Sequence, residues 1–386
     1  MQVVVHYAEV GLKGRNRRRF EDRLAANLAR SLRGLAEASV HWRYGRLLVE
    51  VPESAPEERV LDRLARVFGV AYLSRATLCE PTWEAIERGV DARVEGAEFE
   101  SFGIRARRSD RSHPFRSRDL CERLGARIVE RTGKRVDLTS PDLWIEIHVL
   151  STEAILLHGR IQGPGGLPVG SSGCAVSLMS GGIDSPVASW MALKRGCKLE
   201  YVHFHSAPFT SLASQDKVRE LVASLGAWSG PARLWLVPFG ELQRRLVAEA
   251  PAAPRIVLYR RFMLRIAQAL AERVRARALI TGDSLGQVSS QTLANLDTIG
   301  RAATLPVLRP LVGLDKAEIV ERARAIGSFE ISIEPDEDCC SYLMPRRPAT
   351  WASPLEIDEI ERKLDVSGWV AEVLEQVSHE RIFPSE

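Results

Sequence analysis

Residues 180–185, SGGIDS, bring two serines, two glycines and an aspartate together where an apolar run gives way to an amphipathic one. Glycines let backbone N–H groups approach an anion closely, and the start of a helix adds unpaired N–H groups and a positive dipole end. A simple turn, capped by Ser185 and Pro186, would explain only the last residues of the stretch. The spacing is neither that of a Walker A loop nor G-x-G-x-x-G. We therefore predict a phosphate site of another kind.

Cys339 and Cys340, in EDCCSYLMP, form a second group that could do chemistry. A thiol that carries sulfur must be accessible and partly ionised. The neighbouring Glu337 and Asp338 would raise the pKa of a thiol, and adjacent cysteines also occur as small buried hydrophobes. The residue types alone therefore leave both interpretations open. No C-x-x-C occurs in the chain, which argues against a zinc site and a thioredoxin-type motif.

Basic residues gather in two stretches of the N-terminal half, although the formal net charge is only +3. A clustered basic face on a nearly neutral protein indicates a polyanionic partner, and a solvated arginine-rich surface is the alternative. The candidate RNA-binding residues are Lys13, Arg15 and Arg17 in the first stretch and Arg105, Arg107, Arg108 and Arg116 in the second.

From residue 175 onward, strand and helix patterns alternate. This alternation predicts a parallel sheet covered on both faces, with ligands bound beyond the carboxyl ends of the strands. The loop at 180–185 follows the first of these strands. We predict strands at 175–179, 199–205, 232–239 and 278–282, and helices at 185–195, 211–225, 240–249, 254–276 and 315–326.

Residues 1–161 have an α+β pattern instead, with period-two strands and amphipathic helices. The glycine-rich stretch that follows, residues 162–173, is a linker by composition. We predict strands at 3–7, 40–42, 47–51, 71–77, 98–108, 143–150 and 153–159, and helices at 16–32, at 56–69, from Thr82 and at 117–132.

The composition suits two or three domains, because the chain has 386 residues of which 45% are hydrophobic. No apolar run approaches the about 18 residues of a membrane span, so no membrane association is expected. The first residues lack the charge order and cleavage site of a signal peptide. We therefore expect a cytoplasmic protein in which the six cysteines are reduced rather than paired.

SGGIDS resembles the PP-loop of the ATP pyrophosphatases, and the chain as a whole resembles the tRNA 4-thiouridine synthetases, the ThiI family. The similarity extends over EVGLKGRNRRRF, the segment from GIRARR to LWIEIHV, GPGGLPVGSSG, VHFHSAPFTS, ITGDSLGQVSSQT, LRPLVGLDKAEI and EPDEDCCSYLMP, in family order. The resemblance implies a ferredoxin-like domain at 1–55, a THUMP RNA-binding domain at 56–161, a linker at 162–174 and a PP-loop domain with a doubly wound parallel sheet at 175–386.

The same resemblance implies a set of nucleotide-binding residues. Asp184 would also be a catalytic residue and a magnesium ligand, so ATP and Mg²⁺ are the expected cofactors. The expected ATP-binding residues are Leu178, Met179, Ser180, Gly181, Gly182, Asp184, Ser185, His203, Phe204, Arg260, Gly282 and Gln291.

The implied reaction adenylates O4 of a uridine in tRNA, at position 8, and then replaces that oxygen with persulfide sulfur. Cys340 would be the sulfur-handling residue, and Cys339 could assist or substitute for it. Only 46 residues follow Cys340, so the chain resembles the short form of the family, without a rhodanese domain. A cysteine desulfurase would then supply the sulfur directly, and the thiazole synthesis assigned to rhodanese-bearing relatives is not expected here. A homodimer is consistent with the resemblance.

The thiol that resolves the sulfur-transfer intermediate is left open among Cys79, Cys121, Cys174, Cys197 and Cys339. Two other functions are also considered. A PP-loop ligase acting on a small metabolite would leave the basic N-terminal half without a role. A non-catalytic RNA-binding protein would not need the intact PP-loop and Cys340.

Overall fold

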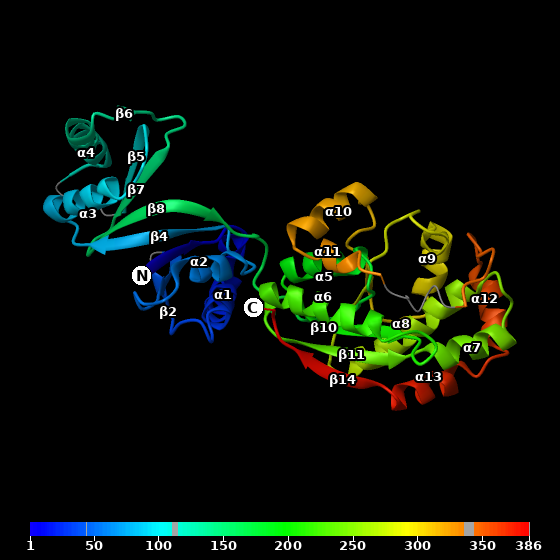
Figure 1. Cartoon of the computed structure of the whole chain (residues 1–386). Coiled ribbons are helices and arrows are strands. Elements are labelled where there is room, and N and C mark those ends of the chain that lie inside the picture. Colours follow the sequence, from blue (N-terminus) through cyan, green and yellow to red (C-terminus); the bar gives the residue numbers. More distant parts are fainter. Residues whose placement is uncertain (44, 110–114, 336–342, 386) are drawn as a thin grey trace. The chain divides into compact units, whose positions relative to one another are not determined.

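The computed structural model describes residues 1–43, 45–109, 115–335 and 343–385. The chain divides into two compact units, residues 1–166 (unit 1) and 167–386 (unit 2), which are described separately below (Figure 1). No helix within the described residues is long and apolar enough to cross a membrane.

Unit 1 contains every strand and helix that the sequence predicts for it, and adds the short strand β6 and two 3-10 helices. Its elements are β1 (Gln2–His6), η1 (Glu9–Leu12), η2 (Gly14–Asn16), α1 (Arg17–Ser31), β2 (Ser39–Arg43), β3 (Arg46–Glu50), α2 (Glu57–Ala65), β4 (Tyr72–Cys79), α3 (Trp83–Glu95), β5 (Ser101–Arg108), α4 (Ser117–Thr132), β6 (Arg135–Val136), β7 (Leu143–Val149) and β8 (Ala154–Gln162).

The strands of unit 1 form one eight-stranded sheet in the order β2-β3-β1-β4-β8-β7-β5-β6. β4 pairs antiparallel with β1 on one side and with β8 on the other. β5 and β7 run parallel to each other. Hydrogen bonding is therefore continuous across the predicted boundary at residues 55 and 56, and the exact limits of the two predicted N-terminal domains stay a prediction.

The four α-helices of unit 1 pack on the same face of this sheet. Val3 and Val5 of β1 join a core with α1 and α2, and Leu156 of β8 joins a core with α3 and α4. Because side chains alternate along a strand, Val4 and Ile155 point to the opposite face. There they belong to a small apolar cluster to which no helix contributes a residue. We call this opposite side the open face.

Unit 2 has the alternating order that its sequence predicts. Its elements are β9 (Cys174–Leu178), α5 (Asp184–Lys194), β10 (Lys198–His205), α6 (Ala213–Ser229), β11 (Ala232–Pro238), α7 (Gly240–Glu249), α8 (Arg255–Arg273), β12 (Leu279–Ile280), η3 (Ser289–Gln291), α9 (Leu293–Gly300), β13 (Val307–Leu308), α10 (Lys316–Ala325), α11 (Phe329–Ser332), α12 (Pro354–Glu361), α13 (Val366–Glu375) and β14 (Ser378–Ile382).

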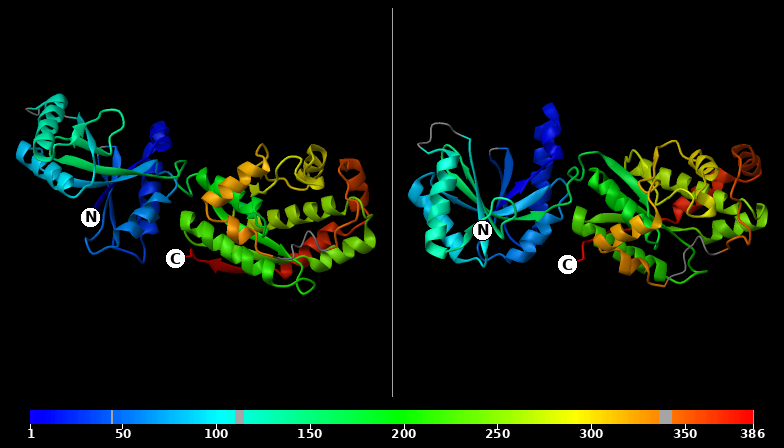
Figure 2. Two further views of the ribbon diagram at one scale, coloured as in Figure 1. Left: turned by 45° about the horizontal axis from the view of Figure 1, so that its top comes forward. Right: turned by 90° about the horizontal axis from the view of Figure 1, so that it is seen from above.

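The sheet of unit 2 has the order β13-β12-β9-β10-β11-β14 and is parallel except for β14. Helices lie on both of its faces (Figure 2). On β9, Val176 packs into the core that contains α8, while the hydroxyl of Ser177 bonds that of Ser189 on α5. The predicted fold class, an α+β region followed by a doubly wound parallel domain, is confirmed.

The glycine-rich stretch after β8 is hydrogen-bonded within each unit. Gly163 and Gly165 donate their backbone N–H groups to Ala71 and Val70 in unit 1. Further along, Leu167 donates to the carbonyl of Lys194 and Gly170 to that of Gly196 in unit 2. The stretch is therefore held by main-chain bonds at both of its ends.

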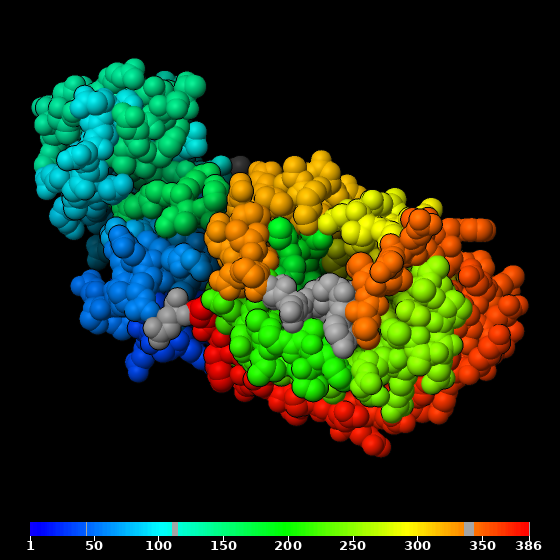
Figure 3. All heavy atoms as spheres, turned by 45° about the vertical axis from the view of Figure 1, so that its right-hand side comes forward, coloured from blue at the N-terminus to red at the C-terminus, as the bar shows by residue number. Residues whose placement is uncertain are grey.

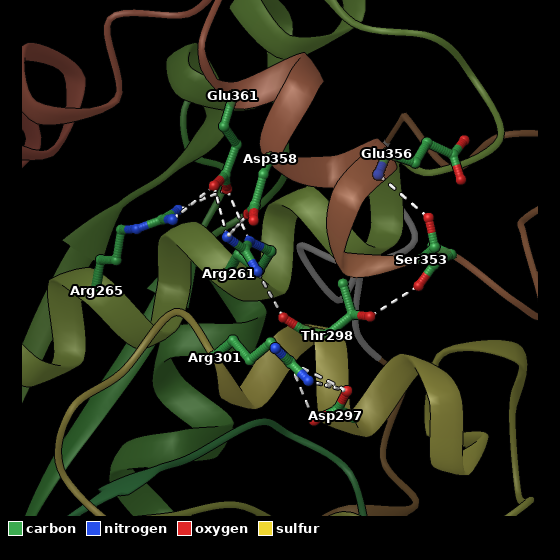
Figure 4. A network of polar contacts seen from close by, with 10 residues as sticks. Arg261, Arg265, Asp297, Thr298, Arg301, Ser353, Glu356, Asp358 and Glu361 are labelled. Atoms are coloured by element: carbon green, nitrogen blue, oxygen red, sulfur yellow. Dashed lines mark hydrogen bonds and ion pairs between the residues drawn. The ribbon is translucent and has the colours of Figure 1, made fainter.

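A buried ion network fastens α12 to α8 (Figure 4). Glu361 accepts bidentate bonds from Arg261 and from Arg265, at 2.6–2.8 Å. Arg261 also donates to Asp358 and to the carbonyl of Thr298 on α9. Burial opposes the ionisation of Glu361, but the hydrogen bonds from Arg265 and Arg261 outweigh it and lower the pKa of the carboxyl.

Candidate nucleotide site and basic surface

The loop at 180–183 lies at the carboxyl end of the central strand β9. From β9 the chain first moves to β10 on one side and later returns to β12 on the other. This reversal of direction is the position where open parallel sheets bind ligands. In the space-filling view, green surface is recessed between the orange surface of α10 and α11 and the yellow surface around α9 (Figure 3).

The hydroxyl of Ser185 organises the loop. It accepts a bond from the backbone N–H of Ser180 at 3.0 Å and donates to the carbonyl of the same residue. The helix begins at Asp184, and within the described chain no side chain caps its N-terminus. The loop is therefore not a simple turn in which Ser185 caps the following helix. The helix terminus remains available to an anion.

Asp184 is held by two residues that the sequence reasoning did not assign to the site. Its carboxylate accepts from Lys316 Nζ at 2.7 Å and from Gln287 Nε2 at 3.0 Å. Lys316 is the first residue of α10 and directly follows the N-cap Asp315, which forms a capping box with Glu318. The block LRPLVGLDKAEI contains Lys316, but its contact with a residue 132 positions away is visible only in the fold.

Gly282 and Gln291 lie in the segment after β12, which forms one wall of the candidate nucleotide site. A Cβ atom on Gly282 would lie 2.9 Å from the backbone nitrogen of Ser185, so only glycine lets this strand end approach the loop. Gln291 Nε2 donates to Asp283 at 3.4 Å, while the buried Gln291 Oε1 has no partner among the described residues. This unpaired acceptor is available to a hydrogen-bond donor of a bound ligand.

Arg260 reaches the same wall, where it pairs with the buried carboxylate of Asp283. Arg309 also contacts Asp283, at 3.3 Å. Burial opposes the ionisation of Asp283, but Arg260, Thr281 and Arg309 together lower the pKa of its carboxyl. Two guanidinium groups thus share one carboxylate, which leaves a net positive charge beside the loop.

The remaining predicted nucleotide residues lie at the ends of β9 and β10. His203 is 2% exposed and its Nδ1 bonds the carbonyl of Met179 at 3.0 Å. The backbone N–H of Met179 donates to the carbonyl of Val202. Leu178 is partly exposed, whereas Met179 and Phe204 are buried as core side chains. Among these side chains, Leu178 is the most accessible to a base.

Cys339 and Cys340 lie outside the described residues, but both flanks of their segment are held. On one side the buried Lys217 donates to the carbonyls of Ser332 and Glu334. On the other side Tyr259 donates to the carbonyl of Leu343.

The four described cysteines, Cys79, Cys121, Cys174 and Cys197, are partly buried and not in disulfides. Burial raises the pKa of each of these thiols. At neutral pH each of them is therefore a poorer nucleophile than an exposed thiol.

In the first basic stretch, two of the three candidate RNA-binding residues form ion pairs within unit 1. Arg17 donates to Glu21 at 2.7 Å and to the hydroxyl of Tyr7 at 2.9 Å, and Lys13 pairs with Glu9 at 3.3 Å. Arg15 is exposed. Of these three, Arg15 is the residue best able to contact a phosphate.

The second cluster lies on and beside β5. Arg105 and Arg107 are exposed on the open face, and Arg105 stacks on the ring of Trp144 at 3.5 Å. Arg108 donates to the carbonyl of Phe115. Arg116 is exposed at the start of α4. The structure therefore brings Arg105 and Arg107 together and places the other two apart from them.

Three family models match the chain. The model described as thiamine biosynthesis protein (ThiI) covers residues 170–366, the ThiI ferredoxin-like domain covers 2–74, and the THUMP domain covers 82–158. Together they account for both compact units.

Curated relatives are similar over almost their full length. A probable tRNA sulfurtransferase of Moorella thermoacetica is 42% identical over 97% of this chain and 96% of its own. One from Thermus thermophilus is 44% identical over 96% of this chain and 91% of its own.

Solved structures agree. A 4-thiouridine synthetase crystallised as an RNA complex with bound ATP has a TM-score of 0.92 and 36% identity, with 99% of both chains covered. PH1313 from Pyrococcus horikoshii shares the fold, with a TM-score of 0.63 and 23% identity over 84% of this chain and 99% of its own.

Proposed function

The chain belongs to the ThiI family of tRNA sulfurtransferases, and we propose that it converts a uridine of tRNA, at position 8, into 4-thiouridine at the expense of ATP. The observation that carries this proposal is the SGGIDS loop at the switch point of the parallel sheet, with Lys316 and Asp184 in contact beside it. A ligase for small metabolites would not need unit 1, and a non-catalytic RNA-binding protein would not need this loop.

In the first step, O4 of the uridine attacks the α-phosphorus of ATP and pyrophosphate leaves. The backbone amides of Gly181 and Gly182 and the hydroxyl of Ser180 would hold the pyrophosphate at the start of α5. Lys316 would balance the charge that develops there. Leu178, Met179, His203 and Phe204 would border the adenine, while Arg260, Gly282 and Gln291 would close the opposite wall.

The donor set is consistent with a magnesium ion. Mg²⁺ is bound in such enzymes by one or two carboxylates together with substrate phosphates, and Asp184 offers one partly exposed carboxylate at the loop. The described residues contain no cluster of three or more protein ligands, so the phosphates would complete the coordination. The ion would supply charge neutralisation at the β- and γ-phosphates.

In the second step, a persulfide on Cys340 attacks C4 with its terminal sulfur, and AMP leaves. The product of that attack is a disulfide between the nucleotide and Cys340. A second thiol then attacks the Cys340 sulfur, which releases 4-thiouridine and forms a protein disulfide that an external thiol must reduce. Cys339 is our preferred second thiol because it is next to Cys340 in the sequence, whereas the four described thiols are partly buried.

The proposed partners follow from this chemistry. A cysteine desulfurase supplies the persulfide sulfur, and tRNA binds to the basic residues of unit 1. The proposed compartment is the cytoplasm, and the proposed assembly is a homodimer. Lys13, Arg15, Arg17, Arg105, Arg107, Arg108 and Arg116 are the proposed phosphate contacts in unit 1.

The test is reconstitution. Purified protein with unmodified tRNA, ATP, Mg²⁺, cysteine and a cysteine desulfurase should yield 4-thiouridine by mass spectrometry of digested tRNA. Cys340→Ser should abolish the product with the desulfurase as donor, and free sulfide should restore part of it. The matched control is Cys197→Ser, which removes a partly buried thiol and should keep wild-type yield. Wild-type yield from Cys340→Ser would overturn the sulfur-carrier assignment, and no product from the wild type would overturn the function.

A further inference from the structure

Residues 284–291 form an arm that lies between β12 and α9. The buried hydroxyl of Ser284 donates to the carbonyl of Leu314, just before α10, at 2.8 Å. Towards the other end of the arm, Asn295 Nδ2 on α9 donates to the carbonyl of Ser289 at 2.7 Å. The arm is therefore fastened to its surroundings on both sides of its central residues.

Gln287, in the middle of the arm, reaches the carboxylate of Asp184. The turn directly before it contains Gly286, whose φ of +76° lies in the left-handed region that favours glycine. Gln287 Nε2 donates to Asp184 Oδ2 at 3.0 Å, and Lys316 Nζ donates to Asp184 Oδ1 at 2.7 Å. The two oxygens of one carboxylate are thus bound by two different donors.

The two donors differ in charge. The ammonium of Lys316 neutralises Asp184 and competes with a metal cation for Oδ1. The amide of Gln287 is neutral, so it holds Oδ2 and leaves the negative charge of the carboxylate in place. Hydrogen bonds to a metal-binding carboxylate fix its orientation. Gln287 can therefore orient Asp184 without weakening the attraction of the carboxylate for a cation.

The side chains around Gln287 distinguish this role from that of a solvated surface glutamine. Leu285, Val288 and Val312 are large apolar residues, and each is about half exposed. Leu285 and Val312 are also neighbours, because the backbone N–H of Leu285 donates to the carbonyl of Val312 at 3.4 Å. Exposed apolar side chains gathered in one place mark surfaces that contact a ligand. The arm is thus part of the candidate site.

From these contacts we infer that Gln287 is a positioning residue for the adenylation step, which holds one oxygen of Asp184 so that the other can bind the cation that accompanies ATP. The inference rests on the proposed function, and it adds a residue that acts through Asp184 rather than on the reacting atoms. Loss of a group that orients a metal-binding residue costs roughly 10- to 100-fold in metal affinity or activity.

The experiment measures ATP binding by isothermal titration calorimetry without tRNA, once in EDTA and once in excess Mg²⁺. The Kd in EDTA divided by the Kd in Mg²⁺ reports how strongly the cation supports ATP binding. Gln287→Leu removes the donor at nearly constant size, so it should lower this ratio by roughly 10-fold or more and leave the Kd in EDTA unchanged.

The matched control is Gln376→Leu, which changes an exposed glutamine of unit 2 whose Nε2 donates to the carbonyl of Glu372. It should keep the wild-type ratio. In a pyrophosphate-release assay, additional Mg²⁺ should restore part of the rate that Gln287→Leu loses. A general folding defect would not respond to Mg²⁺ in this way.

A second variant, Ser284→Ala, keeps Gln287 but releases the arm from the carbonyl of Leu314. It should lower the ratio in the same direction by a smaller factor. A wild-type ratio in Gln287→Leu would overturn the inference, and if that variant does not fold, a wild-type ratio in Ser284→Ala would do so. ATP binding by the wild type that does not depend on Mg²⁺ would also overturn it. If the wild type binds ATP in a Mg²⁺-dependent way but forms no 4-thiouridine, the proposed function fails and the role of Gln287 in ATP binding stands.

Discussion

We expect Gly282→Ala to slow tRNA-dependent pyrophosphate release by roughly 10- to 100-fold, because the new methyl group meets backbone that cannot swing aside. The added Cβ would lie 2.9 Å from the nitrogen of Ser185, and 3.1 Å from both the carbonyl carbon of Asp184 and the Cα of Ser185. A separation under 3.0 Å requires something to shift. The start of α5 must therefore move away from β12, and it carries both the loop-organising hydroxyl and the carboxylate bound by Lys316.

The stability cost of such overpacking is about 1–3 kcal/mol. For a unit of this size, that loss lowers the melting temperature by roughly 2–12 °C. The rate loss should exceed what the stability loss explains, since most molecules remain folded at 25 °C. The geometry of the loop, not the amount of folded protein, then limits the reaction.

The assay measures pyrophosphate release and 4-thiouridine yield on the same preparation, with melting followed by circular dichroism. Gly313→Ala is the matched control, because a Cβ atom there meets nothing within 4 Å. It should retain wild-type rates. If Gly282→Ala also reacts at the wild-type rate, close contact between β12 and the loop does not support the site, and the reasoning is wrong.

Three further outcomes are expected. Lys316→Met should reduce pyrophosphate release about 10²- to 10³-fold, with tRNA affinity unchanged in a filter assay, because Asp184 loses its 2.7 Å partner and the site loses a cation; unchanged release would contradict this role. Glu361→Gln should lower the urea-derived free energy of unfolding by about 3–5 kcal/mol, since two arginines lose a buried partner. The control Glu359→Gln, on the exposed side of α12, should change that free energy by no more than about 0.5 kcal/mol. Unit 1 should lose stability as the pH falls from 6.5 towards 4, because the pKa of His148 is lowered by burial to about 4 in the folded protein and the unfolded chain therefore takes up the proton first. The loss in the free energy of unfolding is at most about 3 kcal/mol. His148→Gln should flatten this pH dependence of stability.

The regular elements were predictable where burial leaves a periodic signal. The four predicted strands of unit 2 and helices such as α7, at 240–249, are confirmed within a few residues, because buried parallel strands are apolar runs and helices repeat every 3.6 residues. β14 was missed because its SHERI sequence is mostly exposed at a sheet edge. α12 was missed despite its visible cap at Ser353.

The site was predictable only where it is local in sequence. All residues of the SGGIDS loop are neighbours in the sequence, and the structure places this loop, as expected, after the end of β9. The partners of Asp184 and of His148 lie more than 100 positions away, and neither contact follows from residue type. Arg260 illustrates the same limit, since its carboxylate partner comes from a different element. The nucleotide and sulfur-transfer roles of individual residues therefore stay predictions.

β4 has both of its edges hydrogen-bonded, to β1 and to β8. The two family models of this region cover residues 2–74 and 82–158, although the strands of both belong to one continuous sheet. A cut between them would leave a long strand with a row of unpaired amide and carbonyl groups, which is a template for edge-to-edge aggregation. In a gene fusion or a domain exchange, the ferredoxin-like and THUMP segments must therefore be transplanted together.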